Sequence, residues 1–271
     1  MNRPKIFKNK SEMPDIQSQI DTRKINIDKV GVKDVRYPIE VFDKKKEKQS
    51  TVASINMYVD LPHRFRGTHM SRFIEVLNEY RGLITSNNIP DILKRIKERL
   101  NANSSHIEIS FSYFIEKKAP VSKTKSLMEY KCKFTGIMAE KSDFILQVEV
   151  PLTTLCPCSK EISKQSAHNQ RSIVKAQVRW DKKLIWIEDL IELIEKCGSS
   201  PVYSLLKRTD EKYVTEHAYD HPMFVEDLVR DISVKLIADK SIIWFLIEAE
   251  NLESIHNHNA YAIVEWSRNN K

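Results

Sequence analysis

The sequence predicts an α+β protein in which antiparallel strands form hairpins and pairs of helices cover one face of the sheet. Two observations predict this class. Apolar and polar residues alternate in strand-like runs along the chain, and helical periodicity lies between pairs of such runs. Both halves follow the same order: strand, strand, helix, helix, strand, strand. We therefore expect an N-terminal extended segment at 1–30, a first module at 31–140 and a second module at 141–271.

In the first module, four strands are expected around two helices. Pro62 ends the second strand, and apolar residues follow at helical spacing from near Met70 and again from near Pro90. A charged run at 44–48 interrupts the strand pattern and predicts a hairpin turn. The four strands are expected at 30–42, 53–61, 107–115 and 127–138.

The second module differs by a long polar loop between its first two strands. Apolar residues alternate before the loop from Phe144 to Val150 and after it from Val174 to Trp180. The remaining elements are expected as a helix at 187–196, a charged connection at 205–216, a helix from His221 onward, and strands at 242–250 and 261–266. Because open antiparallel sheets have edges that must be paired or covered, we also expect an oligomer.

The composition limits the class of partner. The chain of 271 residues has 44 Lys and Arg against 37 Asp and Glu, a net charge of +7 spread along the sequence. This excess suits a phosphorylated substrate or a merely solubilising surface. A nucleic-acid-binding protein would gather basic and aromatic residues on one face, so no nucleic-acid partner is expected. No apolar run reaches the length of a membrane span, no signal peptide opens the sequence, and the four cysteines form no secreted pattern; we expect a cytoplasmic protein without a membrane partner.

The polar loop between the two strands is the candidate active site. A hairpin needs only a few residues to turn, so a loop of this length is usually functional or disordered. It contains Cys156, Cys158 and His168. A single loop cysteine is often only a small buried hydrophobe. His168, however, lies among polar residues and could serve as a second metal ligand or as a general acid–base group, because histidine side chains in general titrate near neutrality.

Later in the chain, further Glu and His residues are candidates for binding a metal ion or the edge of a nucleobase. Glu211 could be a metal ligand or a solvated helix-end carboxylate. Glu226 lies beside the apolar stripe of its helix, where it could accept two N–H donors from a base edge or be an ordinary exposed residue. Glu253, His256 and His258 crowd the last hairpin. Cys, His and Glu together are typical of a zinc-like catalytic site with a position open for water.

Several short motifs make the chain similar to the type IB GTP cyclohydrolase I family, and together they span nearly its whole length. They are the stretches at 13–17, 21–23, 30–32, 66–73, 155–163, 166–171, 206–212 and 254–258, of which Leu-Cys-Pro-Cys-Ser-Lys-Glu-Ile-Ser is the most specific. The resemblance implies the tunnelling fold, in which each module is a four-stranded antiparallel sheet with two helices inserted after its second strand. It implies two such modules in tandem and a homotetramer with active sites at subunit interfaces.

The resemblance also implies an activity: GTP and water give 7,8-dihydroneopterin triphosphate and formate, the first step of tetrahydrofolate biosynthesis. It assigns Cys156 as a metal ligand that is essential for catalysis and His168 as the catalytic histidine. Glu226 matches the glutamate that anchors guanine.

The remaining metal ligands implied by the resemblance are Glu211 and His256, with Glu253 as a further group of the metal shell. The neighbouring Asp210 competes with Glu211 for its assignment. The family uses one divalent ion per site, zinc or manganese, with ferrous iron as a third choice. The candidates for holding the triphosphate are the basic residues Lys160, Arg171, Arg66 and Arg72.

Three alternatives stay open at this point. An archaeal-type cyclohydrolase resembles this family and releases a cyclic phosphate. A tunnelling-fold nitrile reductase would use Cys156 as a covalent nucleophile with NADPH and need no metal. A non-catalytic module could hold RNA through its positive charge.

Overall fold

The protein is described by a computed structural model that covers residues 15–81, 84–181 and 183–268. The first fourteen residues of the predicted N-terminal segment therefore lie outside the described residues. The strands are β1 (Ile27–Asp43), β2 (Glu47–Leu61), β3 (Ser105–Lys118), β4 (Lys125–Met138), β5 (Ser142–Leu155), β6 (Asn169–Trp180), β7 (Ser200–Pro201), β8 (Ile242–Leu252) and β9 (Ala260–Ser267). The helices are α1 (Met70–Glu79), α2 (Ile89–Leu100), α3 (Pro157–Ile162), α4 (Ile187–Glu195), α5 (Arg208–Asp220) and α6 (Val225–Ala238).

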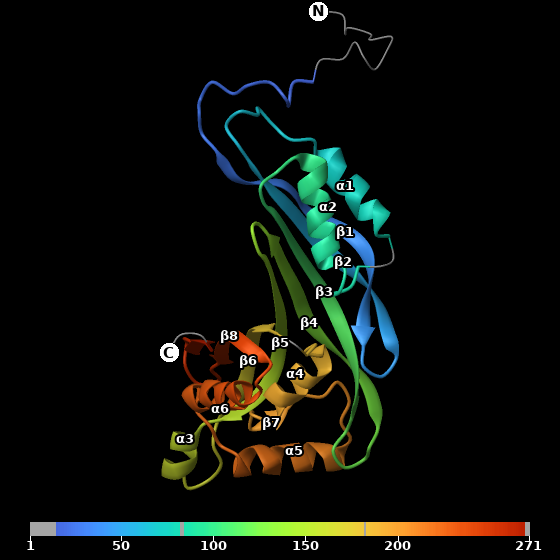
Figure 1. Cartoon of the computed structure of the whole chain (residues 1–271). Helices are drawn as coiled ribbons and strands as arrows, with labels where there is room; N and C mark the ends of the chain where they lie inside the picture. Colours follow the sequence, from blue (N-terminus) through green and yellow to red (C-terminus); the bar gives the residue numbers. More distant parts are fainter. Residues whose placement is uncertain (1–14, 82–83, 182, 269–271) are drawn as a thin grey trace, which may run out of the picture.

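All the strands belong to one antiparallel sheet with the order β1-β2-β3-β4-β5-β6-β8-β9, and the short β7 pairs with β5. In each half the chain leaves the sheet after its second strand, forms helices and returns to pair beside that same strand. Thus α1 and α2 separate β2 from β3 in sequence, and α4 to α6 separate β6 from β8 (Figure 1). The predicted α+β class is confirmed. Within the described residues, no helix is both long and apolar enough to cross a bilayer.

One face of the sheet is apolar from end to end. Directly paired residues form a row across eight strands: Val35, Ile55, Ile109, Phe134, Leu146, Val178, Phe245 and Trp266. Side chains of strand residues two apart share a face, so each member of this row belongs to an apolar stripe on its own strand. The helices place buried residues such as Phe73, Ile92 and Leu228 in the same core. This alternation is the pattern from which the strands were predicted.

The second half differs from the prediction at α5. The sequence at 205–216 was expected to be a charged connection, but residues from Arg208 to Asp220 are helical. This prediction was wrong because α5 lacks an apolar stripe: its only buried residues are Asp210 and Ala218. The helix is held at its start by Asp210, whose carboxylate accepts the backbone N–H of Lys207 at 2.9 Å. A capping carboxylate of this kind supports a helix that hydrophobic periodicity does not reveal.

Two partly buried carboxylates on α4 join the halves of the chain. Glu188 Oε1 accepts the hydroxyl of Tyr113 at 2.7 Å. Glu195 Oε1 accepts the hydroxyl of Tyr130 at 2.6 Å and Lys117 Nζ at 2.7 Å. Burial and these carboxylates raise the pKa of both tyrosines, so both stay protonated as donors. The boundary expected near residue 140 falls in the turn between β4 and β5, but the sheet and these contacts continue across it. The division into modules at that position stays a prediction.

Candidate active site

Cys156 lies where β5 ends and the polar loop begins. It is the N-cap of α3, and Pro157 follows at the first helical position, which proline favours because its fixed φ suits a helix start. The backbone N–H of Cys156 donates to the carbonyl of His168 at 3.1 Å. The predicted loop is therefore closed at its base, and it brings these two residues together across the β5–β6 pair.

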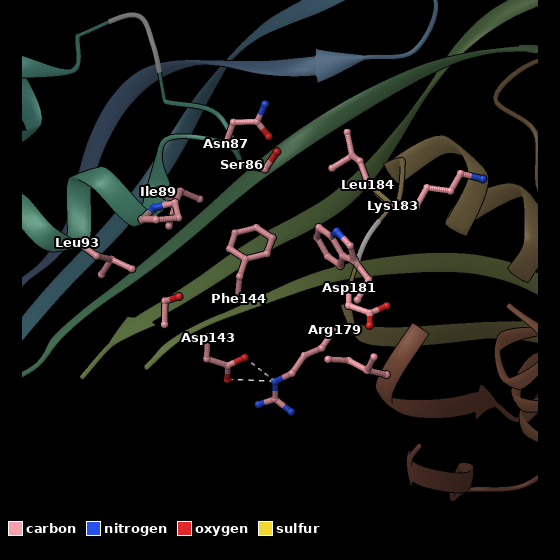
Figure 2. Close-up of a pocket in the computed structure, with 14 residues that line it drawn as sticks. Ser86, Asn87, Ile89, Leu93, Asp143, Phe144, Arg179, Asp181, Lys183 and Leu184 are labelled. Atoms are coloured by element: carbon pink, nitrogen blue, oxygen red, sulfur yellow. Dashed lines mark hydrogen bonds and ion pairs between the residues drawn. The ribbon is translucent and has the colours of Figure 1, made fainter. Parts of the chain in front are cut away.

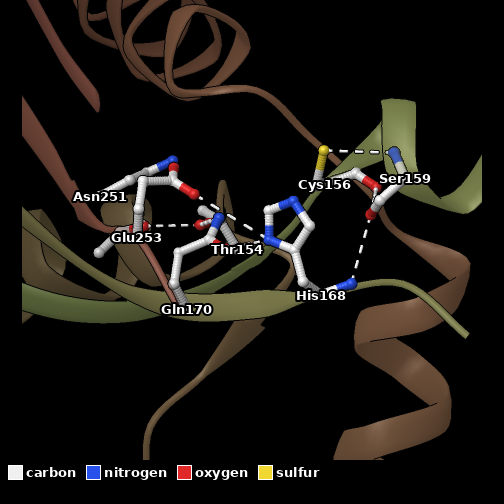
Figure 3. Close-up of polar contacts among 8 residues, drawn as sticks. Thr154, Cys156, Ser159, His168, Gln170, Asn251 and Glu253 are labelled. Atoms are coloured by element: carbon white, nitrogen blue, oxygen red, sulfur yellow. Dashed lines mark hydrogen bonds and ion pairs between the residues drawn. The ribbon is translucent and has the colours of Figure 1, made fainter. Parts of the chain in front are cut away.

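The thiol of Cys156 is ordered by the loop around it. Its Sγ accepts the backbone N–H of Ser159 at 3.4 Å, and Ser159 Oγ donates to the Cys156 carbonyl at 3.2 Å. The same Ser159 oxygen accepts the backbone N–H of His168 at 3.3 Å (Figure 3). Cys156 is partly buried, whereas Cys158 is exposed. The two thiols of the Cys-Pro-Cys motif therefore have different surroundings.

His168 stands between the loop and the end of β8. Its Nδ1 is 3.1 Å from Gln170 Oε1 and 4.0 Å from the Glu253 carboxylate. The side chains of His168 and Glu253 are only 15% and 10% exposed. Figure 3 shows Gln170 and Glu253 on the Nδ1 side of the ring, with the other ring nitrogen turned to the side where Cys156 lies.

A buried polar network continues from Gln170 into the sheet. Gln170 Nε2 donates to Thr154 Oγ1 at 3.0 Å, and Thr154 Oγ1 is 2.8 Å from Ser172 Oγ. Ser172 in turn donates to Asn251 Oδ1 at 2.5 Å. We did not predict these residues from the sequence. The sequence did contain a sign of the network. Thr154 and Ser172 occupy inward-facing positions of the strands that contain Val150 and Val174, but their side chains are polar.

The turn between β8 and β9 brings His256 and His258 to the same end of the sheet. The rings of His168 and His256 lie perpendicular with centroids 6.5 Å apart. His256 and His258 stack at 5.2 Å, and both are exposed. The structure therefore gathers three of the predicted site residues: His168, Glu253 and His256.

Glu226 lies three residues after the point where the chain leading into α6 contacts the end of β5. The backbone N–H of Met223 donates to the carbonyl of Leu155 at 2.9 Å, immediately before Cys156. Glu226 lies in the first turn of α6 and is exposed, while its neighbour Asp227 accepts the backbone N–H of Phe224 at 3.1 Å. Asp227 therefore caps the helix, and Glu226 remains a predicted site residue with an exposed side chain.

Asp210 and Glu211 occupy different environments. Asp210 is fully buried and accepts hydrogen bonds from Val121 N, Ser122 N and Ser122 Oγ at 2.7–2.8 Å, in addition to Lys207. Burial alone would raise the pKa of Asp210, but these donors hold it well below its ordinary value. Asp210 thus fastens α5 to the β3–β4 hairpin. Glu211, in contrast, is exposed beside that hairpin.

Glu211 does not meet Cys156 within one chain. One end of α5 lies beside α3 (Figure 1). There Lys160 Nζ lies over the Tyr219 ring, 4.3 Å from its centroid. At 1.5 Å per residue, Glu211 is roughly 12 Å further along the helix axis than Tyr219. No group of three His, Cys, Asp or Glu residues is close enough to hold a metal ion among the described parts of the chain. The donor types suit zinc, but one chain alone does not assemble the predicted ligand set.

The basic candidates for the triphosphate divide between the halves. Lys160 also donates to the Tyr219 carbonyl, and Arg171 is exposed on β6. Arg72 donates to the carbonyl of Arg99 at 3.1 Å in the first half, and Arg66 lies in the connection between β2 and α1. Only Lys160 and Arg171 belong to the elements around Cys156.

A hollow of about 520 Å³ lies elsewhere, between the start of α2, the start of β5 and the end of β6 (Figure 2). Phe144 and Trp180 line it, and Arg179 Nε donates to Asp143 at 2.8 Å on its wall. It contains neither cysteine nor histidine. The predicted catalytic and metal-binding residues Cys156, His168 and His256 therefore lie outside this hollow, in the β5–β6 loop and the β8–β9 turn.

Comparisons with known proteins show the family of this chain. Residues 13–262 match the family model described as type I GTP cyclohydrolase folE2. The chain belongs to the FolE2 family. It is 63% identical over 254 residues to GTP cyclohydrolase FolE2 of Syntrophotalea carbinolica, covering 94% of this chain and 95% of that protein. It is 61% identical over 259 residues to GTP cyclohydrolase FolE2 of Geotalea uraniireducens, covering 96% and 95%.

Solved structures resemble this FolE2 family member in fold alone. Uricase from Arthrobacter globiformis superposes with a TM-score of 0.56 at 7% identity, over 90% of this chain and 94% of that one. A uricase from Bacillus fastidious gives a TM-score of 0.58 at 6% identity, over 88% and 93%. The chain has the tunnelling fold, as the resemblance in sequence implied.

Proposed function

We propose that this chain hydrolyses GTP to 7,8-dihydroneopterin triphosphate and formate, the first step of tetrahydrofolate biosynthesis. Membership of the FolE2 family over 250 of its 271 residues carries this conclusion. The proximity of His168 to Cys156, Glu253 and His256 supports it, because a thiol, a carboxylate and two imidazoles are groups that the reaction needs.

Glu226 and His168 have different roles in the proposed reaction. Glu226 accepts N1–H and the exocyclic amine of guanine, a pair of donors that adenine lacks. Where the bound base covers Glu226 and excludes water, leaving the carboxylate unpaired against the wrong base costs about 1–3 kcal/mol, which favours GTP. His168 delivers a proton to the ring nitrogen as the imidazole ring of guanine opens and then accepts one, as an imidazole does readily.

A divalent metal, zinc or manganese with ferrous iron as a third choice, is the proposed cofactor. Cys156 and His256 would hold it, with Glu253 nearby as a further group. When bound, such an ion lowers the pKa of its water so that hydroxide is available near neutrality to attack C8 of guanine. Because Glu211 lies at the far end of α5, we propose that it reaches the site from a neighbouring copy in a homotetramer.

The sheet supplies a route to that oligomer. Among the described strands, β1 and β9 are the outermost members, and each has only one neighbour. An unpaired edge is a template for pairing with another chain. Tyr261 and Ile263 on β9 and Ile27 on β1 are exposed apolar residues at these edges, as expected of surfaces that are covered on assembly.

The activity is tested by incubating purified protein with GTP and zinc or manganese, followed by oxidation and fluorescence detection of the pterin. We expect a pterin triphosphate and formate, loss of turnover with chelator, and recovery on adding metal. A cyclic phosphate product would identify the archaeal-type reaction instead. If no product forms with any of several divalent metals, the proposal is wrong.

The shared site is tested by mixing two inactive variants, Cys156→Ala and Glu211→Gln. If the site uses Glu211 from a neighbouring copy, exchange of subunits restores some intact sites, and activity returns on mixing. Two variants that act within the same chain cannot complement each other. Absence of recovery despite verified exchange would place Glu211 within its own chain's site or outside the site.

A further inference from the structure

We propose that Gln170, anchored by Thr154, Ser172 and Asn251, is a positioning residue that fixes the His168 ring with its proton on Nδ1 and its Nε2 free on the side of Cys156. The inference goes beyond the proposed function and rests on it in one respect, the use of His168 in turnover. The placement of the proton itself follows from the hydrogen bonds.

The direction of the network determines which nitrogen carries the proton. Ser172 has one hydroxyl proton and donates it to Asn251 Oδ1, so its oxygen must accept from Thr154. Thr154 then has no second proton and accepts from Gln170 Nε2 at 3.0 Å. Gln170 therefore presents its amide oxygen to His168, and Nδ1 must be the donor across their 3.1 Å contact.

A nearby negative charge favours the same tautomer, independently of the network. The Glu253 carboxylate approaches His168 Nδ1 at 4.0 Å from the end of β8. A carboxylate and an amide oxygen on one side of the ring both favour N–H at that nitrogen. The tautomer of a histidine is set by the partner of its other nitrogen. Nε2 is thus left with its lone pair, the form that can accept a proton.

The anchor is rigid because it is buried. Thr154 and Ser172 are 0% exposed, Asn251 is 3% and Gln170 is 7% exposed. Buried polar groups that are fully paired hold their geometry, since breaking one bond leaves another group unsatisfied away from water. The cross-strand pairs Thr154–Gln170 and Ser172–Asn251 attach the network to three adjacent strands. His168 at the loop end is thereby tied to the stable part of the sheet.

The test removes the anchor without touching His168. Thr154→Val keeps the shape of the side chain and deletes the hydroxyl that accepts from Gln170. We expect kcat to fall by about 10–100-fold, the usual loss when a group that orients a functional ligand is removed. KM for GTP and bound metal should stay within about twofold. The matched control is Thr153→Val, the same change one residue earlier on the opposite face of β5, which should leave kcat within about twofold.

A double mutant separates positioning from general damage. If Thr154 acts through His168, Thr154→Val should cost nothing further in a His168→Ala background, because effects of residues in one unit are not additive. A full additional loss in that background would mean that Thr154 stabilises the fold rather than the imidazole, and would overturn the proposal.

A spectroscopic measurement tests the inference independently of turnover. In protein labelled with ¹⁵N-histidine, the His168 ring nitrogens distinguish the two neutral tautomers. We expect Nδ1–H in the parent protein and a mixture of tautomers in Thr154→Val, with Thr153→Val unchanged. A parent protein with Nε2–H would refute the proposal even if GTP is hydrolysed. Nδ1–H in a chain without GTP turnover would retain the placement of the proton and reject the proposed function.

Discussion

The hydroxyl of Tyr130 on β4 donates to the carboxylate of Glu195 on α4 at 2.6 Å, a partly buried hydrogen bond between the two halves of the chain. Lys117 Nζ is bound to the same oxygen at 2.7 Å, and both partners of this ion pair are about nine-tenths buried. This contact supplies a direct test of how the halves are held together.

Tyr130→Phe should destabilise the protein by about 1.5–3 kcal/mol, the range for hydrogen bonds to charged groups. The ring still fills its space, so the loss reports the hydroxyl alone. Urea unfolding measures it, with Tyr213→Phe as a control because Tyr213 is 45% exposed. A surface change of that kind should alter the free energy of unfolding by no more than about 0.5 kcal/mol. Equal effects of the two changes would contradict the role given to Glu195.

Asp210→Asn should lower the stability of the protein, whereas Glu211→Gln should lower its metal content and turnover. The Asp210 change weakens the bonds to Val121, Ser122 and Lys207, so we expect a lower Tm. Glu211 has an exposed side chain, and its change should leave Tm unaltered while lowering metal content and turnover. Calorimetry and metal analysis on both variants check this. A drop in Tm for Glu211→Gln instead would remove the distinction between the two carboxylates.

Asp210 should also make stability depend on pH in acid. Its pKa is lowered in the folded protein, so the folded state favours the charged form more than the unfolded chain does. The stabilisation is fully present above the ordinary pKa of 3.8 and is lost as pH falls from there toward the lower folded-state pKa. The stability difference between the parent and Asp210→Asn should therefore be constant near neutrality and shrink below pH 3.8. A difference that grows on acidification would reverse the assigned sign.

Cys156→Ala should abolish turnover, whereas Cys158→Ala should leave a measurable fraction. Cys156 is partly buried and lies beside the backbone of His168, while the side chain of Cys158 is exposed. Turnover of GTP in saturating metal measures both, and metal content shows whether Cys156 acts as a ligand. Complete loss in both variants would mean that the two thiols work as a pair.

Glu226→Ala should remove GTP binding and leave the metal in place. The carboxylate stands in the first turn of α6 without a capping role, which Asp227 fills. Asp231→Ala, an exposed acid later on the same helix, is the control for a general change in charge. Calorimetric titration with GTP decides the matter, and unaltered affinity in the Glu226 variant would exclude it as the guanine anchor.

The order of strands was predictable because the sheet buries one continuous face. Ile107 to Ile115 alternate strictly, and β3 covers that range. Helices with an apolar stripe, such as α2 and α4, were predictable for the same reason. The positions of Cys156 and His168 at the two ends of one loop followed from the strands on either side. The pairing of these two predicted strands was therefore enough to bring Cys156 and His168 together.

What the sequence concealed depends on polar contacts between distant segments. Helix α5 is stabilised by Asp210, whose partner Ser122 is 88 residues away in sequence, so no local pattern marks it. Thr154 and Asn251 read as ordinary polar residues at strand ends until the sheet brings them together. The surroundings of Glu211 were not predictable either. Its exposure and its separation from the Cys156 loop depend on where α5 packs.

The carboxylates Glu188, Glu195 and Asp210 all belong to the second half, yet most of their donors come from the first. A fragment that begins near residue 141 would keep these three carboxylates and lose most of the donors that hold them. Each repeat expressed by itself should then be insoluble or unfolded, whereas co-expression of the two pieces should rescue them. We therefore expect the two predicted modules to unfold together, as one cooperative unit.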